Sequence, residues 1–345
     1  MSKIKVFLGG YINYTNAQNL NCRAVAEYLD KDKFVVFALT THFGKNERFK
    51  ANTFNCFRPF SFSNHLGFLW GILNCDVAYL PKHIDTPLWV LKLAKILKKP
   101  SFTTIEGNVT DLRKSNLISF FGTANIMKNH FSYFKQVFGI SHFLIQETQS
   151  VIFMNDTPLL LGVNVHQFDS KLAKKLRSIV FVGGLIKRKR VDEFLQLAEF
   201  YPQINFNIIG NGSEKDNLEK KSSSNVIFHG VLSHAKMNVI FQKSDLMFLP
   251  AISEGFPKVI LEAASAGISS IVYNTYGASN WMNDRENGFI VNDFNEVKRI
   301  VNELLENPTL LQEVSSNTQE LANGYNWENV IKDWEKVIVN LYNGK

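Results

Sequence analysis

The stretch that most constrains the fold of this chain is residues 244–274, which reads as a strand, a tight turn, a helix and a second strand. The apolar run Leu246–Leu249 leads into a small polar turn that ends in Glu254-Gly255-Phe256-Pro257, and apolar residues at helical spacing follow. Proline favours the first turn of a helix, because its missing N–H would have had no partner there. The stretch therefore predicts one strand–helix–strand unit of a parallel sheet.

The same stretch predicts an anion site. The N–H groups of Val259 and Ile260 are expected to point out of the helix N-terminus, where the helix dipole favours a phosphate. Glu254 lies just before the helix and Glu262 about two turns further on. Two carboxylates around a phosphate site indicate a ligand with hydroxyl groups at both ends, the shape of a nucleotide sugar. The spacing alone fits solvated helix glutamates equally well.

Strands and helices alternate along the rest of the chain, which favours parallel sheets built from βα units. In the first half we expect strands at Val6–Leu8, Phe34–Leu39, Asp76–Pro81, Phe102–Ile105, His142–Gln146 and Pro158–Gly162. In the second half we expect them at Ile179–Val182, Ile204–Ile209, Val226–Phe228, Leu246–Leu249, Ser269–Tyr273 and Phe289–Val291. The length of 345 residues predicts two domains, 1–165 and 166–325, with a final helix over 326–345.

Composition indicates a cytoplasmic protein. No run of about 18 apolar residues predicts a membrane-spanning helix, and the opening strand KIKVFL leaves no room for a signal peptide. Cys22, Cys56 and Cys75 stand at spacings unlike those of metal sites and read as reduced thiols. No convincing carboxylate cluster predicts a metal site.

The first half of the chain is the basic half. Residues 1–165 carry 18 Lys and Arg against 10 Asp and Glu, a net charge of +8, whereas the remaining residues carry 20 against 21, a net charge of −1. Six aromatic residues between Phe54 and Trp70 are interleaved with basic ones nearby. This tract is either core or an interfacial segment beside anionic lipid. With no nucleic-acid motif present, an anionic membrane surface or a phosphorylated acceptor is the partner we favour over nucleic acid.

The segment EGFPKVILEAASAG, with seven residues between Glu254 and Glu262, resembles the Glu-x7-Glu motif of family-4 retaining glycosyltransferases of the group 1 type. FVGGLIKRKRVDEF, NIIGNGSEKDNLE and YGASNWMNDRENGFIVND resemble further family segments in the same order. The resemblance implies the GT-B fold, in which two Rossmann-like doubly wound α/β domains face each other across a cleft. The terminal helix then crosses back to the first domain.

Carried over to this chain, the resemblance assigns the donor nucleotide sugar to the second domain and the acceptor to the first. Glu254 would contact the transferred sugar, Glu262 the ribose hydroxyls and Lys189 the diphosphate. The family usually has an arginine where this chain has Gly184, so Arg188 or Arg190 is expected to supply the second cation. The remaining expected donor-side residues are Gly183, Gly184, Gly255, Phe256, Pro257, Val259 and Ile260, and those on the acceptor side are Gly10, Glu106, Gly107 and Asn108.

The resemblance implies a metal-independent, retaining transfer without a cofactor, because fixed cations and a helix N-terminus favour a departing dianionic nucleotide. Uridine diphosphate donors are favoured and guanosine diphosphate mannose remains open. The acceptor class implied is a glycan or a lipid-linked sugar, in bacterial surface polysaccharide assembly at the inner face of the cell membrane. Two alternatives stay open: a nucleotide-sugar epimerase of the same fold, and a non-catalytic nucleotide-sugar or glycan-binding protein.

Overall fold

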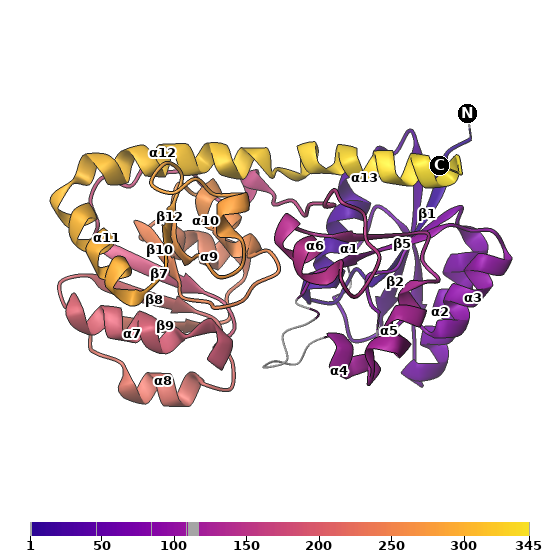
Figure 1. The fold of residues 1–345 in the computed structure, drawn as a ribbon, viewed down its shortest axis with the longest axis horizontal. Helices are drawn as coiled ribbons and strands as arrows, with labels where there is room; N and C mark the ends of the chain where they lie inside the picture. The colour runs from indigo at the N-terminus through magenta and orange to yellow at the C-terminus, as the bar shows by residue number, and fades with distance from the viewer. Residues whose placement is uncertain (1, 46, 84, 108, 110–116, 345) are drawn as a thin grey trace. The chain divides into compact units, whose positions relative to one another are not determined.

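The computed structural model describes residues 2–45, 47–83, 85–107, 109 and 117–344. They form two compact units (Figure 1). Unit 1 comprises Met1–Leu161 together with Trp327–Lys345, and unit 2 comprises Gly162–Asn326. Each unit contains one six-stranded sheet in which all strand pairs are parallel. The α/β class predicted from the sequence is confirmed.

Unit 1 is a doubly wound sheet with the strand order β3-β2-β1-β4-β5-β6. Its strands are β1 (Ile4–Tyr11), β2 (Phe34–Thr41), β3 (Asn52–Cys56), β4 (Val77–Tyr79), β5 (Ser101–Ile105) and β6 (Gln136–Gly139). Its helices are α1 (Ala17–Tyr28), α2 (Phe60–Asn74), α3 (Leu88–Ile96), α4 (Leu117–Phe121), α5 (Ala124–Phe131), α6 (His142–Thr148) and α13 (Trp327–Tyr342).

The strand register shows how both faces of this sheet are covered. Leu8 pairs with Tyr79, and Tyr79 with Phe102, so these residues share one face. Trp334 of α13 packs on Tyr79 and Phe102, with ring centroids 4.9 and 6.1 Å away. Phe7, on the opposite face, meets Phe68 of α2 edge-on at 6.0 Å. The terminal helix is therefore a core element of unit 1.

Unit 2 repeats the topology, with the strand order β12-β11-β10-β7-β8-β9. Its strands are β7 (Ser178–Val182), β8 (Asn205–Ile209), β9 (Val226–Gly230), β10 (Leu246–Leu249), β11 (Ser269–Tyr273) and β12 (Phe289–Val291). Its helices are α7 (Val191–Phe200), α8 (Lys215–Lys221), α9 (His234–Phe241), α10 (Lys258–Ser265), α11 (Phe294–Glu306) and α12 (Pro308–Gly324). Short 3₁₀ turns lie at Val165–Gln167, Lys187–Lys189 and Ala278–Asn280.

Two strands predicted at the end of the first half are wrong. His142–Gln146 lies in α6, because the Ser141 side chain caps the helix by accepting the Leu144 N–H at 3.3 Å. The fifth predicted strand is instead replaced in the sheet by β6, which ends just before α6. Pro158–Gly162, the sixth predicted strand, has no regular secondary structure. Its Leu159 N–H still donates to the Gly139 carbonyl at 2.9 Å, which explains why the segment reads as extended.

The Phe-rich tract is divided between core and surface. It forms β3 and α2, and Phe68 is fully buried, whereas Phe57 and Phe62 are 44% and 58% exposed. Over the described residues, no helix combines the length and apolar character needed to span a membrane.

Candidate functional site

The strand order places a ligand site at the same point of each sheet. In doubly wound sheets ligands bind beyond the carboxyl ends of the strands, where the winding direction changes. In unit 2 this point lies between the neighbouring strands β7 and β10. The loop after β7 carries Lys189, and the loop after β10 carries Glu254. The two predicted catalytic residues therefore leave adjacent strands.

Backbone contacts fix the loop after β7. The Gly183 N–H donates to the Ile209 carbonyl at 3.0 Å, and the Leu185 N–H donates to the Asn211 carbonyl at 2.9 Å. A Cβ at Gly210, whose φ is +149°, would lie 1.8 Å from the Gly183 oxygen, so only glycine allows this approach. The predicted donor residue Gly184 borders open space, because a Cβ there would meet nothing within 4 Å.

Lys189, Arg188 and Glu254 form a three-charge cluster. Lys189 Nζ lies 2.5 Å from Glu254 Oε1, and Arg188 Nη1 lies 3.0 Å from the same oxygen. The side chains of Lys189 and Glu254 are each only 10% exposed. Arg188 Nη1 also donates to the Ser253 carbonyl at 2.5 Å. One carboxylate thus holds two cations, and the cluster keeps a net charge of +1.

Arg190, the other candidate for the second cation, has different partners. Its guanidinium pairs with Glu193 and lies 5.4 Å above the Tyr273 ring, and the Tyr273 hydroxyl donates to Glu193 at 2.6 Å. The residue has left-handed backbone angles, φ 49° and ψ 43°, where the 3₁₀ turn meets α7. The structure therefore groups Arg188 with Lys189 and places Arg190 outside the cluster.

The N-terminus of α10 differs from the prediction at one amide. The sequence predicts Pro257 in the first turn of the helix, whereas the structure has it as the N-cap, one residue before α10 begins at Lys258. The Ile260 N–H donates to the Pro257 carbonyl at 2.9 Å, because the first turn closes with a tight three-residue bond. The expectation that this amide points freely outward is therefore wrong, and Val259 is the remaining predicted amide. Phe256, beside them, packs on the rings of Trp281 and Tyr325 at 5.4 and 5.3 Å.

The second predicted carboxylate, Glu262, lies further along α10. Glu262 Oε1 is 3.7 Å from His234 Nε2, and its side chain is 21% exposed. Among the described residues, neither Lys189 nor Arg188 forms an ion pair with Glu262. The two glutamates thus have separate surroundings, as two different roles require.

In unit 1 the predicted acceptor residue Gly10 lies near the carboxyl end of β1, and Glu106 and Gly107 follow β5. A Cβ at Gly10 would come within 2.7 Å of Cys22 Sγ, so this glycine allows α1 to pack closely. Glu106 accepts hydrogen bonds from Asn21 at 3.0 Å and from the Thr104 hydroxyl at 3.3 Å. A Cβ at Gly107 would meet nothing within 4 Å. Asn108 lies outside the described residues.

Sequence reasoning missed Lys82, which follows β4 at the switch point of unit 1. Its amino group lies 2.6 Å from Asp85 and 5.0 Å from the centre of the Tyr11 ring, and its side chain is 10% exposed. The Tyr11 hydroxyl donates to Asn64 of α2. The sequence feature that could have identified Lys82 is its position directly after a predicted buried strand.

Two buried histidines lie beneath this edge. His83 Nε2 is 3.1 Å from the Thr104 carbonyl oxygen, and the rings of His83 and His130 are 6.5 Å apart. Burial, then the nearby His130, lowers the pKa of His83 to about 3, and burial lowers the pKa of His130 to about 4. Both are neutral at pH 7. His130 packs against Phe121 and Phe131.

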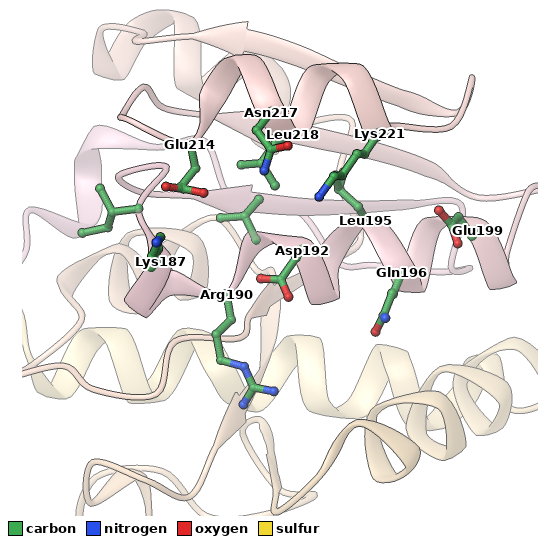
Figure 2. A pocket seen from close by; sticks show the side chains of 12 residues that line it. Lys187, Arg190, Asp192, Leu195, Gln196, Glu199, Glu214, Asn217, Leu218 and Lys221 are labelled. Atoms are coloured by element: carbon green, nitrogen blue, oxygen red, sulfur yellow. The ribbon is translucent and has the colours of Figure 1, made fainter. Parts of the chain in front are cut away.

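A separate pocket lies between α7 and α8 (Figure 2). Its floor is apolar, with Val191, Leu195 and Leu218, and its rim carries charges of both signs. Arg190 and Lys187 line it, but Lys189, Glu254 and Glu262 do not. This pocket is therefore distinct from the three-charge cluster.

Comparison with known proteins supports the assignment made from the motif. Residues 163–321 match the family model described as "Glycosyl transferases group 1". The chain is 30% identical over 167 residues to the alpha-galactosylglucosyldiacylglycerol synthase of Streptococcus pneumoniae, which covers 45% of this chain and 44% of that protein. It spans about half the length of the curated relatives it matches.

Solved structures resemble both units. Sucrose-phosphate synthase from Thermosynechococcus elongatus superposes with a TM-score of 0.83 at 15% identity, over 99% of this chain and all of that one. Anabaena HepE in complex with UDP-glucose superposes with a TM-score of 0.76 at 15% identity, over 98% of this chain and all of that one. These likenesses confirm the predicted GT-B fold class.

Proposed function

Residues 163–321 belong to the group 1 glycosyl transferases, and from this we propose that the chain is a glycosyltransferase that uses a nucleoside-diphosphate sugar. The observation that carries the proposal is the cluster of Lys189, Arg188 and Glu254 at the switch point of that domain. Two preorganised cations next to a carboxylate suit a ligand that joins a diphosphate to a sugar.

In the proposed mechanism, the charges of this cluster lower the barrier to the transfer. Cleavage of the sugar–phosphate bond leaves one further negative charge on the terminal phosphate of the departing nucleotide, and fixed cations stabilise that charge as it develops. Lys189 and Arg188 are the groups we assign to this task. Because both now pair with Glu254, the diphosphate replaces that carboxylate as their partner and releases Glu254 to accept a sugar hydroxyl.

The remaining assignments follow from position. Glu262, separate from the cluster, is the proposed partner of the ribose hydroxyls. We propose a retaining transfer in which the departing phosphate takes the acceptor's proton, so no protein nucleophile or metal is assigned. Gly10, Glu106 and Gly107 remain the proposed acceptor residues, joined by Lys82.

The proposed donor is a UDP-hexose, since HepE, whose structure this chain resembles, binds UDP-glucose. GDP-mannose is the second candidate. The proposed acceptor is a lipid-linked sugar or glycan of the bacterial surface, supported by the diacylglycerol product in the name of the pneumococcal relative.

We further propose that the protein is cytoplasmic and binds the membrane surface peripherally through unit 1. Exposed Tyr14 and Phe43 form an aromatic patch with half-buried Phe60, and exposed Phe57 and Phe62 lie within three residues of Phe60 in the sequence. Tyr14 and Phe60 each contact the Phe43 ring, at 5.4 and 5.5 Å. Such aromatic side chains beside basic residues suit the headgroup region of an anionic bilayer.

Incubation with a panel of UDP- and GDP-sugars tests the proposal. The expected result is slow hydrolysis of one donor to free nucleoside diphosphate, accelerated by the correct acceptor. A change in the sugar without release of nucleotide would identify an epimerase instead. Binding without turnover, even with lipid extracts as acceptor, would identify a binding protein and overturn the proposed activity.

A further inference from the structure

Tyr276 is a buried tyrosine whose hydroxyl has no hydrogen-bond partner among the residues that the structure describes. It follows β11 by three residues, its side chain is 1% exposed, and no described residue accepts from or donates to its oxygen. Other buried tyrosines of unit 2 are satisfied. The Tyr273 hydroxyl donates to Glu193, and the single proton of the Tyr201 hydroxyl is shared between Asn302 Oδ1 at 2.8 Å and the Lys298 carbonyl at 3.0 Å.

The position of Tyr276 relates it to the three-charge cluster. Leu249, the last residue of β10, pairs with Val272 of β11, so the loops that carry Glu254 and Tyr276 leave the sheet side by side. The two loops also touch, since Phe256 packs on Trp281. Burial, and then the negative charge of Glu254, hold the pKa of the Tyr276 hydroxyl well above its usual range. The hydroxyl therefore stays protonated and able to donate.

A buried hydroxyl without a partner destabilises the folded state, so its presence requires an explanation. A residue that only packed would do better as phenylalanine. The cost is explained if a bound ligand supplies the missing partner. That ligand group must also tolerate the adjacent Glu254 carboxylate, which repels phosphate but accepts hydrogen bonds from a sugar hydroxyl.

We propose that the Tyr276 hydroxyl binds a hydroxyl group of the donor's sugar ring, on the opposite side of that group from Glu254. This inference rests on the proposed function and adds a sugar-binding residue to it. A sugar hydroxyl held between the two can donate to the carboxylate and accept from the phenol. Tyr276 then contributes to the choice of donor sugar, because a sugar without that hydroxyl leaves the phenol unpaired again.

The test compares Tyr276→Phe with Tyr201→Phe, a matched loss of one buried phenol oxygen in the same unit. Without ligand, Tyr276→Phe should melt at the parent temperature or above it, whereas Tyr201→Phe should melt lower because it loses the hydrogen bond shared by Asn302 and the Lys298 carbonyl. Affinity is then measured for the nucleotide sugar that the donor panel identifies and for its nucleoside diphosphate. Tyr276→Phe should weaken nucleotide-sugar binding about threefold to tenfold and leave diphosphate binding unchanged. Tyr201→Phe should change neither.

The outcomes separate this inference from the proposed function. If the parent protein binds no nucleotide sugar, the proposed function fails. If the parent binds one and Tyr276→Phe binds it equally well, the inference alone is overturned. Equal losses for the nucleotide sugar and the nucleoside diphosphate would also overturn it, because the hydroxyl would then contact the nucleotide. A lower melting temperature for Tyr276→Phe would show that the hydroxyl is satisfied within the protein, and would overturn it as well.

Discussion

Units 1 and 2 share one strand order, yet their switch points carry different chemistry. In unit 2, two cations meet a buried carboxylate there. In unit 1 the corresponding position has the pair Lys82–Asp85, whose aspartate is 45% exposed, beside the neutral side chains of Tyr11 and Asn64. Topology thus decides where each ligand binds, and the loop residues decide its charge. The proposed donor site in unit 2 therefore suits an anion, whereas the proposed acceptor site in unit 1 suits a more neutral partner.

Among the substitutions that test this difference between the units, Lys189→Ala should lower turnover the most. Loss of a preorganised cation at a developing phosphate charge costs about 3–4 kcal/mol, or about 10²–10³ in turnover. The folded protein also loses one of the two cationic partners of the largely buried Glu254 carboxylate and keeps Arg188 as the other. Donor hydrolysis rates, together with melting curves that show the variant is folded, measure the two effects.

Lys187→Ala is the matched control, because Lys187 lies two residues away on the same 3₁₀ turn and is exposed. It should remain close to the parent rate. Equal and small losses at both positions would mean that the turn is an ordinary basic surface, and that unit 2 is no more anion-selective than unit 1.

Acid should weaken unit 1 through its two buried histidines. The pKa values of His83 and His130 lie at about 3 and about 4 in the folded protein, below the ordinary 6.5. The unfolded chain therefore binds protons first, so stability falls as the pH drops below about 6.5. At pH 5 each histidine should lower the free energy of unfolding by about 2 kcal/mol.

Urea unfolding at pH 7.5 and 5 checks this expectation. Tryptophan fluorescence reports mainly on unit 1, which contains four of the five tryptophans. His130→Phe should remove roughly half of the pH-dependent loss, because one titrating ring is gone. An unchanged difference between the two pH values in this variant would contradict the assignment to the buried histidines.

Glu262→Gln and Glu254→Gln should separate the two carboxylates of unit 2. Glu262→Gln exchanges a charge-assisted hydrogen bond to ribose for a neutral one and should weaken nucleoside diphosphate binding by about 1–2 kcal/mol. Glu254→Gln should lower turnover while diphosphate affinity holds or rises, since Lys189 and Arg188 lose their competing partner. Calorimetric titration and donor hydrolysis measure the two quantities. Parent-like turnover in both variants would refute the two-carboxylate assignment.

The smallest expected effect concerns the aromatic patch of unit 1. Co-sedimentation with anionic vesicles should exceed that with neutral vesicles and fall with salt, since each basic residue near such a surface contributes about 1 kcal/mol. Phe43→Ser should reduce binding, because its ring is 54% exposed. The control Phe200→Ser removes a ring of similar exposure, 59%, from unit 2. Equal binding to both vesicle types, or to neither, would argue against a membrane-facing role.

Much of unit 2 could be read from the sequence. The predicted strands Leu246–Leu249, Ser269–Tyr273 and Phe289–Val291 match the structure residue for residue. Continuous apolar runs between turn residues mark buried parallel strands clearly. In unit 1 the strand β3, with the sequence NTFNC, is polar and so lacks that signal. The first residues of α6 are apolar and read as a strand in the sequence, but the Ser141 side chain caps a helix there.

The sequence by itself determined which residues could form the donor site, because Lys189, Glu254 and Glu262 stand at fixed places relative to strands and helices. Only the tertiary structure decided which neighbours join them. From the sequence, Arg188 and Arg190 were equal candidates for the second cation. In the structure, Arg190 has a left-handed backbone and contacts Glu193 and Tyr273 instead of Glu254. The unpaired hydroxyl of Tyr276 is likewise invisible in sequence, because a missing partner is defined only when distant segments have packed around it.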